Sequence, residues 1–96
     1  MLKAEGVYYF FPATHGMGRS GVPDIICCVS GKFLAIECKA EGGKPTALQL
    51  NEIAAIRDSG GVAAIASTNA AEMVRAFIKL IREGIKPTYL EVGKEE

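Results

Sequence analysis

The chain has 96 residues, 49% of them hydrophobic, with 11 acidic and 11 basic side chains. This length suits a single domain, and the apolar content excludes a disordered chain. A formal net charge of zero gives no general affinity for nucleic acid, so such a function would need a local site. The chain contains neither an apolar run of about 18 residues nor a secretory signal, so we expect a cytoplasmic protein that does not enter a membrane.

The first half of the chain predicts three strands. Aromatic and β-branched residues at 7–12 (VYYFFP) indicate the first, and a glycine-rich loop, ATHGMGRSG, follows it. Two more strands are expected at Ile25–Ser30 and Phe33–Lys39. The dipeptide Gly31-Lys32 would join them, because a type II′ turn prefers glycine at its first central position.

The second half alternates helix and strand. We expect a helix from Thr46 to about Asp58, a buried strand at 62–66 and a helix from about Ala70 to Glu83. The apolar face of the last helix would comprise Met73, Val74, Phe77, Ile78 and Ile81. The predicted fold is one α/β domain with a mixed sheet of about four strands flanked by helices. Its core spans about residues 7–83, and residues 84–96 form a peripheral tail.

Three cysteines, Cys27, Cys28 and Cys38, lie in the apolar strand-like runs. They are odd in number and lack Cys-x-x-Cys spacing. We therefore expect reduced, buried thiols, with no disulfide and no zinc site.

The hairpin brings three charged residues together. With Gly31-Lys32 as the turn, Asp24 lies opposite Lys39, and Ile26 lies opposite Glu37. Because cross-strand partners share a face, Asp24, Glu37 and Lys39 would project on the same side of the sheet. A register shift of one residue would separate them.

Two carboxylates side by side predict a cation between them. Mg²⁺ suits, since it takes oxygen ligands and keeps several waters. The main-chain carbonyl of Cys38 could add a ligand, and Lys39 could assist an attacking water or stabilise charge on a phosphate. The structural alternative is an Asp24–Lys39 cross-strand pair with Glu37 in solvent.

The motifs GVPD (21–24), IECK (36–39) and KPTALQ (44–49) resemble the PD-(D/E)xK nuclease superfamily. More closely, the chain is similar to the virus-type replication-repair nuclease (VRR-NUC) domain in its stand-alone phage form, from about Val7 to Ile81. The resemblance implies a restriction-endonuclease-like core. It also implies hydrolysis of DNA phosphodiesters, often in branched or flapped DNA, and a homodimer like that of Holliday-junction resolvases.

The resemblance also implies roles for single residues. Asp24 and Glu37 would bind Mg²⁺ or Mn²⁺, Lys39 would be the catalytic lysine, and Gln49 would complete the site. The family usually has an acidic residue on a helix before the first strand. This chain departs from that pattern, and Glu5 is the acid that could replace it.

Several residues have two interpretations. Gln49 fits the site, but Thr46-Ala-Leu-Gln49 also matches a capping box. His15, Arg19 and Lys44 could contact substrate phosphate, although a loop residue or a solvated lysine is the more common role of such side chains. The segment GMGRSG lacks the Gly-Lys-Ser/Thr ending of a nucleotide-binding loop, so no nucleotide cofactor is expected.

The leading hypothesis is a metal-dependent DNA endonuclease. The alternatives are a non-catalytic DNA-binding module of the same fold and an RNA-directed relative.

Overall fold

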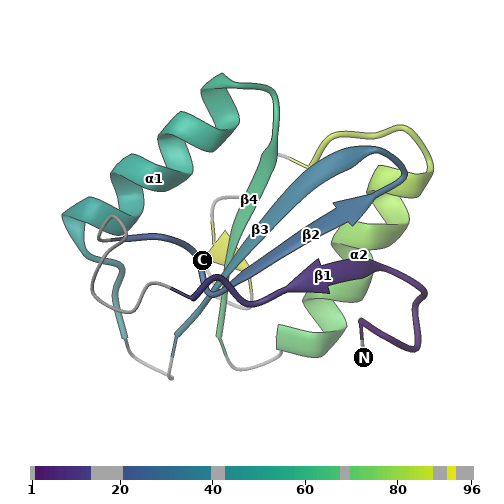
Figure 1. Ribbon diagram of the computed structural model, residues 1–96, viewed down its shortest axis with the longest axis horizontal. Coiled ribbons are helices and arrows are strands. Elements are labelled where there is room, and N and C mark those ends of the chain that lie inside the picture. Colours follow the sequence, from purple (N-terminus) through teal and green to yellow (C-terminus); the bar gives the residue numbers. More distant parts are fainter. Residues whose placement is uncertain (1, 14–20, 40–42, 68–69, 88–90, 93–96) are drawn as a thin grey trace.

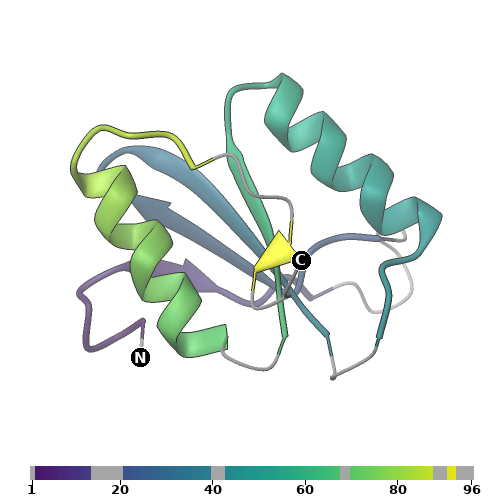
Figure 2. The same cartoon turned by 180° about the vertical axis from the view of Figure 1, so that it is seen from behind.

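The structure is a computed structural model that describes residues 2–13, 21–39, 43–67, 70–87 and 91–92. A five-stranded sheet in the order β1-β2-β3-β4-β5 has α1 on one face and α2 on the other (Figure 1). Figure 2 shows the α2 face from behind. The elements are β1 (Tyr8–Phe10), β2 (Ile25–Val29), β3 (Lys32–Cys38), α1 (Ala47–Asp58), β4 (Val62–Ala66), α2 (Ala70–Arg82) and β5 (Glu91–Val92).

The sheet is mixed. Strands β1, β2 and β3 are antiparallel, whereas β4 runs parallel to β3 after the α1 crossover. The α/β class with a mixed sheet and flanking helices is thereby confirmed, and it is compatible with a restriction-endonuclease-like core. Within the predicted tail, Glu91–Val92 pairs with β4 as a fifth strand.

The β2–β3 turn corrects the predicted register. The turn residues are Ser30 and Gly31, with φ of 50° and 81°, and Val29 pairs with Lys32. Positive φ at both central residues is the type I′ pattern, which favours glycine at the second position rather than the first. Ile26 therefore pairs with Ala35 instead of Glu37. The error is two residues, so every side chain keeps its predicted face.

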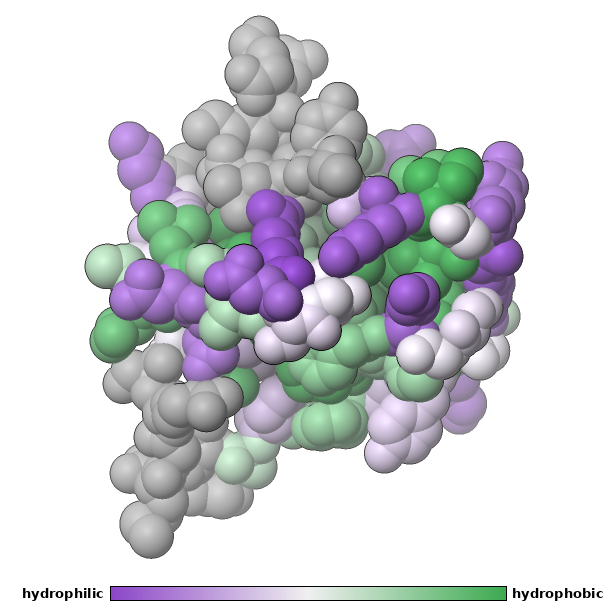
Figure 3. All heavy atoms as spheres, turned by 90° about the horizontal axis from the view of Figure 1, so that it is seen from above, coloured by the Kyte–Doolittle hydropathy of each residue, from purple (hydrophilic) through white to green (hydrophobic). Residues whose placement is uncertain are grey.

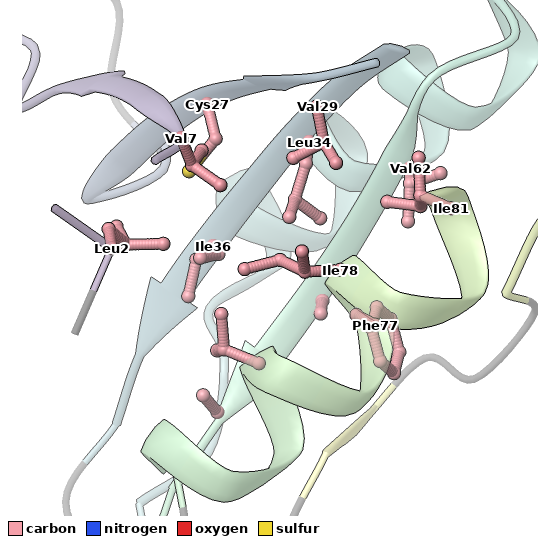
Figure 4. Close-up of a cluster of buried hydrophobic side chains, with 13 residues drawn as sticks. Leu2, Val7, Cys27, Val29, Leu34, Ile36, Val62, Phe77, Ile78 and Ile81 are labelled. Atoms are coloured by element: carbon pink, nitrogen blue, oxygen red, sulfur yellow. The ribbon is translucent and has the colours of Figure 1, made fainter. Parts of the chain in front are cut away.

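The main core lies between the sheet and α2. Figure 4 shows its side chains from β2, β3, β4 and α2, together with Leu2 and Val7 from the N-terminal segment. The predicted apolar face of α2 is confirmed for Val74, Phe77, Ile78 and Ile81, which are buried, while Met73 is half-buried and packs against them. Burial of each such side chain contributes about 1.5–3 kcal/mol, so this face carries most of the stability.

The cysteines do not behave alike. Cys27 is buried on the α2 face, where burial raises the pKa of its thiol to about 11. Cys28 and Cys38 are exposed, so the prediction of three buried thiols is wrong for these two. Cys28 follows Cys27 along β2 and points to the opposite face, because strand side chains alternate. All three cysteines are free thiols.

The face covered by α1 has a smaller core. It comprises Ala35, Ile53, Ala63 and Ile65, with Ile26 and Ile56 packed beside them. Helix α1 packs along β4, so it leaves the β1–β2 part of this face open. Within the described part of the chain, neither helix is long and apolar enough to cross a membrane.

Candidate active site

Two acidic residues from neighbouring strands form the centre of the candidate site. Ile25 pairs with Ile36, so Asp24 and Glu37 are the next residues opposite each other, on the face that α1 covers. Asp24 is exposed, and its Oδ2 accepts a hydrogen bond of 2.8 Å from the amide of Cys38. The corrected register therefore brings Asp24 opposite Glu37, where the sequence predicted Lys39.

Glu37 is a buried carboxylate with one satisfied oxygen. Its Oε2 accepts a hydrogen bond from Gln49 Nε2 and lies 3.5 Å from Lys39 Nζ. Its Oε1 is buried, and no group among the described residues donates a hydrogen bond to it. Burial raises the pKa of Glu37, and the charge of Asp24 raises it further, while Lys39 and the main-chain amide of Asp24 lower it. The site thus contains a carboxylate that lacks a positive partner for one oxygen.

Gln49 has both of the roles that the sequence left open. Its Oε1 accepts from the Thr46 amide at 2.9 Å, and Thr46 Oγ1 accepts from the Gln49 amide at 3.1 Å, which completes the capping box. The Nε2 of the same side chain donates to Glu37. The side-chain amide of Gln49 therefore takes part in the N-terminal cap of α1 and also binds the buried Glu37.

Lys39 follows β3 directly. Its amide donates to the Ala66 carbonyl at 2.9 Å, which extends the contact between β3 and the end of β4 by one residue. Its side chain is 18% exposed and pairs with Glu37. The alternative of an Asp24–Lys39 pair with a solvated Glu37 is therefore wrong, since Glu37 is only 4% exposed.

Gly21 also shapes the site, although its sequence position alone does not predict this role. With φ of 84°, it packs against the first turn of α1, where an added Cβ would lie 2.6 Å from the main-chain carbon and oxygen of Leu48. Only glycine fits this approach. The GVPD segment is therefore held against the turn that carries Gln49. The signal in the sequence was the glycine itself, but nothing there showed which backbone it would meet.

Glu5 does not join the site. Its carboxylate lies 3.4 Å from Arg82 Nη1 and 3.8 Å from Arg75 Nε, both on α2. Its carbonyl also accepts a hydrogen bond from Arg82. Because α2 covers the opposite face from Glu37, Glu5 as a replacement acid is wrong. The N-terminal segment is directed to the α2 face by Leu2 and Val7, which are buried there.

The remaining predicted residues are not brought to the acids by any described contact. Lys44 is exposed. His15 and Arg19 lie outside the described residues. For Cys38 the amide contacts Asp24, and the carbonyl as a metal ligand stays a prediction.

The donor set fits a hard divalent cation. It offers two neighbouring carboxylates, one with a buried oxygen that no described group satisfies. Across the described ranges there is no cluster of three or more His, Cys, Asp or Glu residues. Carboxylate oxygens are the ligands of hard cations such as Mg²⁺, which is commonly held by one or two carboxylates and otherwise by water and substrate phosphate.

Comparison with known proteins finds similarity over part of the chain. No family model and no solved structure matches the chain. A protein named "Putative nuclease p44", from Acyrthosiphon pisum secondary endosymbiont phage 1, is 45% identical over 51 residues. The chain resembles a phage protein named as a nuclease. The similarity spans 52% of each protein, so the chain covers about half the length of that relative. The VRR-NUC assignment stays a prediction.

Proposed function

We propose that this protein is an Mg²⁺- or Mn²⁺-dependent nuclease that hydrolyses DNA phosphodiester bonds, with Asp24, Glu37, Lys39 and Gln49 as its active site. The single observation that carries the proposal is that Glu37 is buried and that its Oε1 has no hydrogen-bond partner among the described residues. A buried carboxylate with an unsatisfied oxygen is costly unless a partner completes it. A divalent cation held by Glu37 and Asp24 would be such a partner.

The residues of the site would divide the chemistry among them. Asp24 and Glu37 would hold the cation, which supplies a Lewis acid for the phosphate and lowers the pKa of a coordinated water. Gln49 would fix the rotamer of Glu37 through Oε2. Lys39 Nζ, beside the same oxygen, would stabilise the negative charge that develops on the phosphate.

The finer features of the substrate and assembly belong to the same proposal. The resemblance favours branched, flapped or junction DNA and a homodimer with two active sites. A chain of this size with zero net charge has little non-specific affinity for a duplex. Two copies acting on one bent or branched substrate would compensate for that. Light scattering of the purified protein measures the assembly directly, and a monomer at all concentrations contradicts the homodimer.

The decisive experiment is a cleavage assay on labelled linear, flapped, forked and four-way DNA with Mg²⁺, Mn²⁺ or EDTA. We expect metal-dependent cutting that Lys39→Ala lowers by about 10²–10³-fold, the usual effect of removing one group that stabilises transition-state charge. Lys32→Ala is the matched control, because Lys32 is an exposed lysine at the other end of β3. It should cut like the wild type.

Three results would count against the proposal. Cutting that persists in Lys39→Ala would identify a contaminant or a different site. DNA binding without cutting in either metal would favour the non-catalytic module. Cutting of RNA in preference to DNA, with the same loss in Lys39→Ala, would favour the RNA-directed relative.

A further inference from the structure

The open part of the α1 face is an aromatic strip beside the candidate active site. Tyr8 and Phe10 of β1 point to this face, 69% and 46% exposed, with ring centroids 6.3 Å apart. Phe33 of β3, 44% exposed, belongs to the same face. On the side of the molecule seen from above in Figure 3, hydrophobic and hydrophilic side chains lie next to each other at the surface. We use "aromatic strip" for Tyr8, Phe10 and Phe33.

The strand register connects the aromatic strip to the acids. Tyr8 pairs with Cys28 and Phe10 pairs with Ile26, so the next residue on this face of β2 is Asp24. One strand spacing and two residues of rise put Phe10 about 8 Å from Asp24 along the sheet, and Tyr8 about 14 Å away. A nucleic-acid strand whose phosphate reaches Asp24 and Glu37 would therefore pass over these rings within a few nucleotides.

We propose that Tyr8 and Phe10 are a stacking platform for unpaired bases, so that the substrate of the nuclease has single-stranded nucleotides next to the bond that is cut. The proposal rests on the proposed function only for the position of that bond. Exposed rings on an open sheet face stack on bases without reading their sequence. Flapped or forked DNA offers such bases, whereas an intact duplex keeps them paired.

The composition and area of the aromatic strip favour bases over a second copy of this chain. At their exposed fractions the three rings offer roughly 300 Å² of surface. A stable protein interface needs about 800 Å² on each partner. In addition, the aromatic strip leads directly to the acids, so a protein partner there would cover the route to the candidate site.

The test measures affinity apart from cutting. Labelled oligothymidylate of about 16 nucleotides and a duplex of the same length are titrated in EDTA and followed by fluorescence anisotropy. We expect Tyr8→Ala/Phe10→Ala to lose at least about ten-fold in affinity for the oligothymidylate and little for the duplex. Tyr8→Phe, which keeps the ring, should bind like the wild type.

Leu48→Ala is the matched control, because Leu48 is an apolar side chain with 54% exposure on α1, outside the aromatic strip. It should leave both affinities unchanged. Circular dichroism establishes that each variant is folded. If the double variant is unfolded, Tyr8→Ser alone replaces it, since Tyr8 is the more exposed ring.

Two results would overturn the stacking platform. One is unchanged affinity for the oligothymidylate in the folded ring-deletion variant. The other is a wild-type dimer that becomes a monomer when the rings are removed, which would assign the aromatic strip to a second copy. Failure of the two proposals can be distinguished. If Tyr8→Ala/Phe10→Ala loses oligothymidylate binding but the wild type shows no metal-dependent cutting, the nuclease alone is rejected. Cutting that needs Lys39 but does not respond to ring removal, with full oligothymidylate affinity, rejects the platform alone.

Discussion

The two helices cover the sheet unequally. Helix α2 buries Val74, Phe77, Ile78 and Ile81 against it. Helix α1 has nearly the same length, yet Ile53 is its single buried residue, and Leu48 and Leu50 are exposed. The candidate site lies entirely on the α1 face. The sheet therefore separates two regions of the molecule. The apolar core that contributes most of the stability lies on the α2 face, and the residues of the proposed chemistry lie on the α1 face.

The largest expected effect tests the closed face. Phe77→Ala should lower the free energy of unfolding by about 3–5 kcal/mol, because it removes a buried ring and leaves a cavity. Leu50→Ala, a change to an exposed residue on α1, should cost no more than about 0.5 kcal/mol. Urea unfolding measures both. Equal losses in the two variants would show that α1 stabilises the fold as much as α2 does.

The second prediction concerns the contact between the GVPD segment and α1. Gly21→Ala should lower the free energy of unfolding by about 2–4 kcal/mol, since it combines the strain of a positive φ with a steric clash. Gly31→Ala is the matched control, with a φ of 81° and open space around it, and should cost about 1 kcal/mol.

Thermal unfolding and DNA cleavage of both glycine variants complete this comparison. Because Gly21 packs against the turn that carries Gln49, we expect Gly21→Ala to reduce cutting and Gly31→Ala to leave it intact. Equal stability and activity of the two variants would mean that the close approach at Leu48 has no role.

The third prediction concerns the raised pKa of Glu37, which lies on the α1 face. Because the folded state raises its pKa, the folded protein binds more protons than the unfolded chain between the unfolded and folded pKa values. Without metal, stability from this group is therefore present below the unfolded pKa and is lost as the pH rises through the raised one. Glu37→Gln should stabilise the metal-free protein at neutral pH by about 1 kcal/mol, which raises the melting temperature by roughly 4–8 °C.

Melting curves in EDTA from acid to neutral pH measure this difference. The gap between Glu37→Gln and the wild type should close as the pH falls and Glu37 becomes protonated. Added Mg²⁺ should raise the melting temperature of the wild type and not that of the variant. If Glu37→Gln is less stable than the wild type at neutral pH, the unsatisfied oxygen of Glu37 does not lower the stability of the metal-free protein.

Local patterns were enough to predict most of the fold. The apolar spacing of Val74, Phe77, Ile78 and Ile81 gave α2, and the run at 62–66 gave β4, because both signals depend on near neighbours in the chain. The predicted hairpin turn was one residue too late in the chain. Glycine suits the first central position of a type II′ turn and the second of a type I′ turn, so Gly31 alone did not decide between them. The shared face of Asp24 and Glu37 survived, since a two-residue displacement preserves alternation.

What the sequence could not give depends on contacts between distant segments. It identified Glu5 as an acid near the first strand, but only packing of Leu2 and Val7 decides that Glu5 lies beside Arg82. It likewise allowed two roles for Gln49, and the position of the first turn of α1 beside Glu37 shows that its amide makes both contacts. Side-chain direction at element ends is set by tertiary packing, which local propensity does not encode.

The Gln49 amide has a consequence for measurement in solution. Its oxygen accepts from Thr46 and its nitrogen donates to Glu37, so the group cannot rotate by half a turn without losing both bonds. Any change in the charge of Glu37 is thereby transmitted to the first backbone amides of α1. The amide resonances of Thr46 and Gln49 should then shift together on titration with Mg²⁺ or acid, which makes the start of this helix a spectroscopic reporter of the carboxylate beneath it.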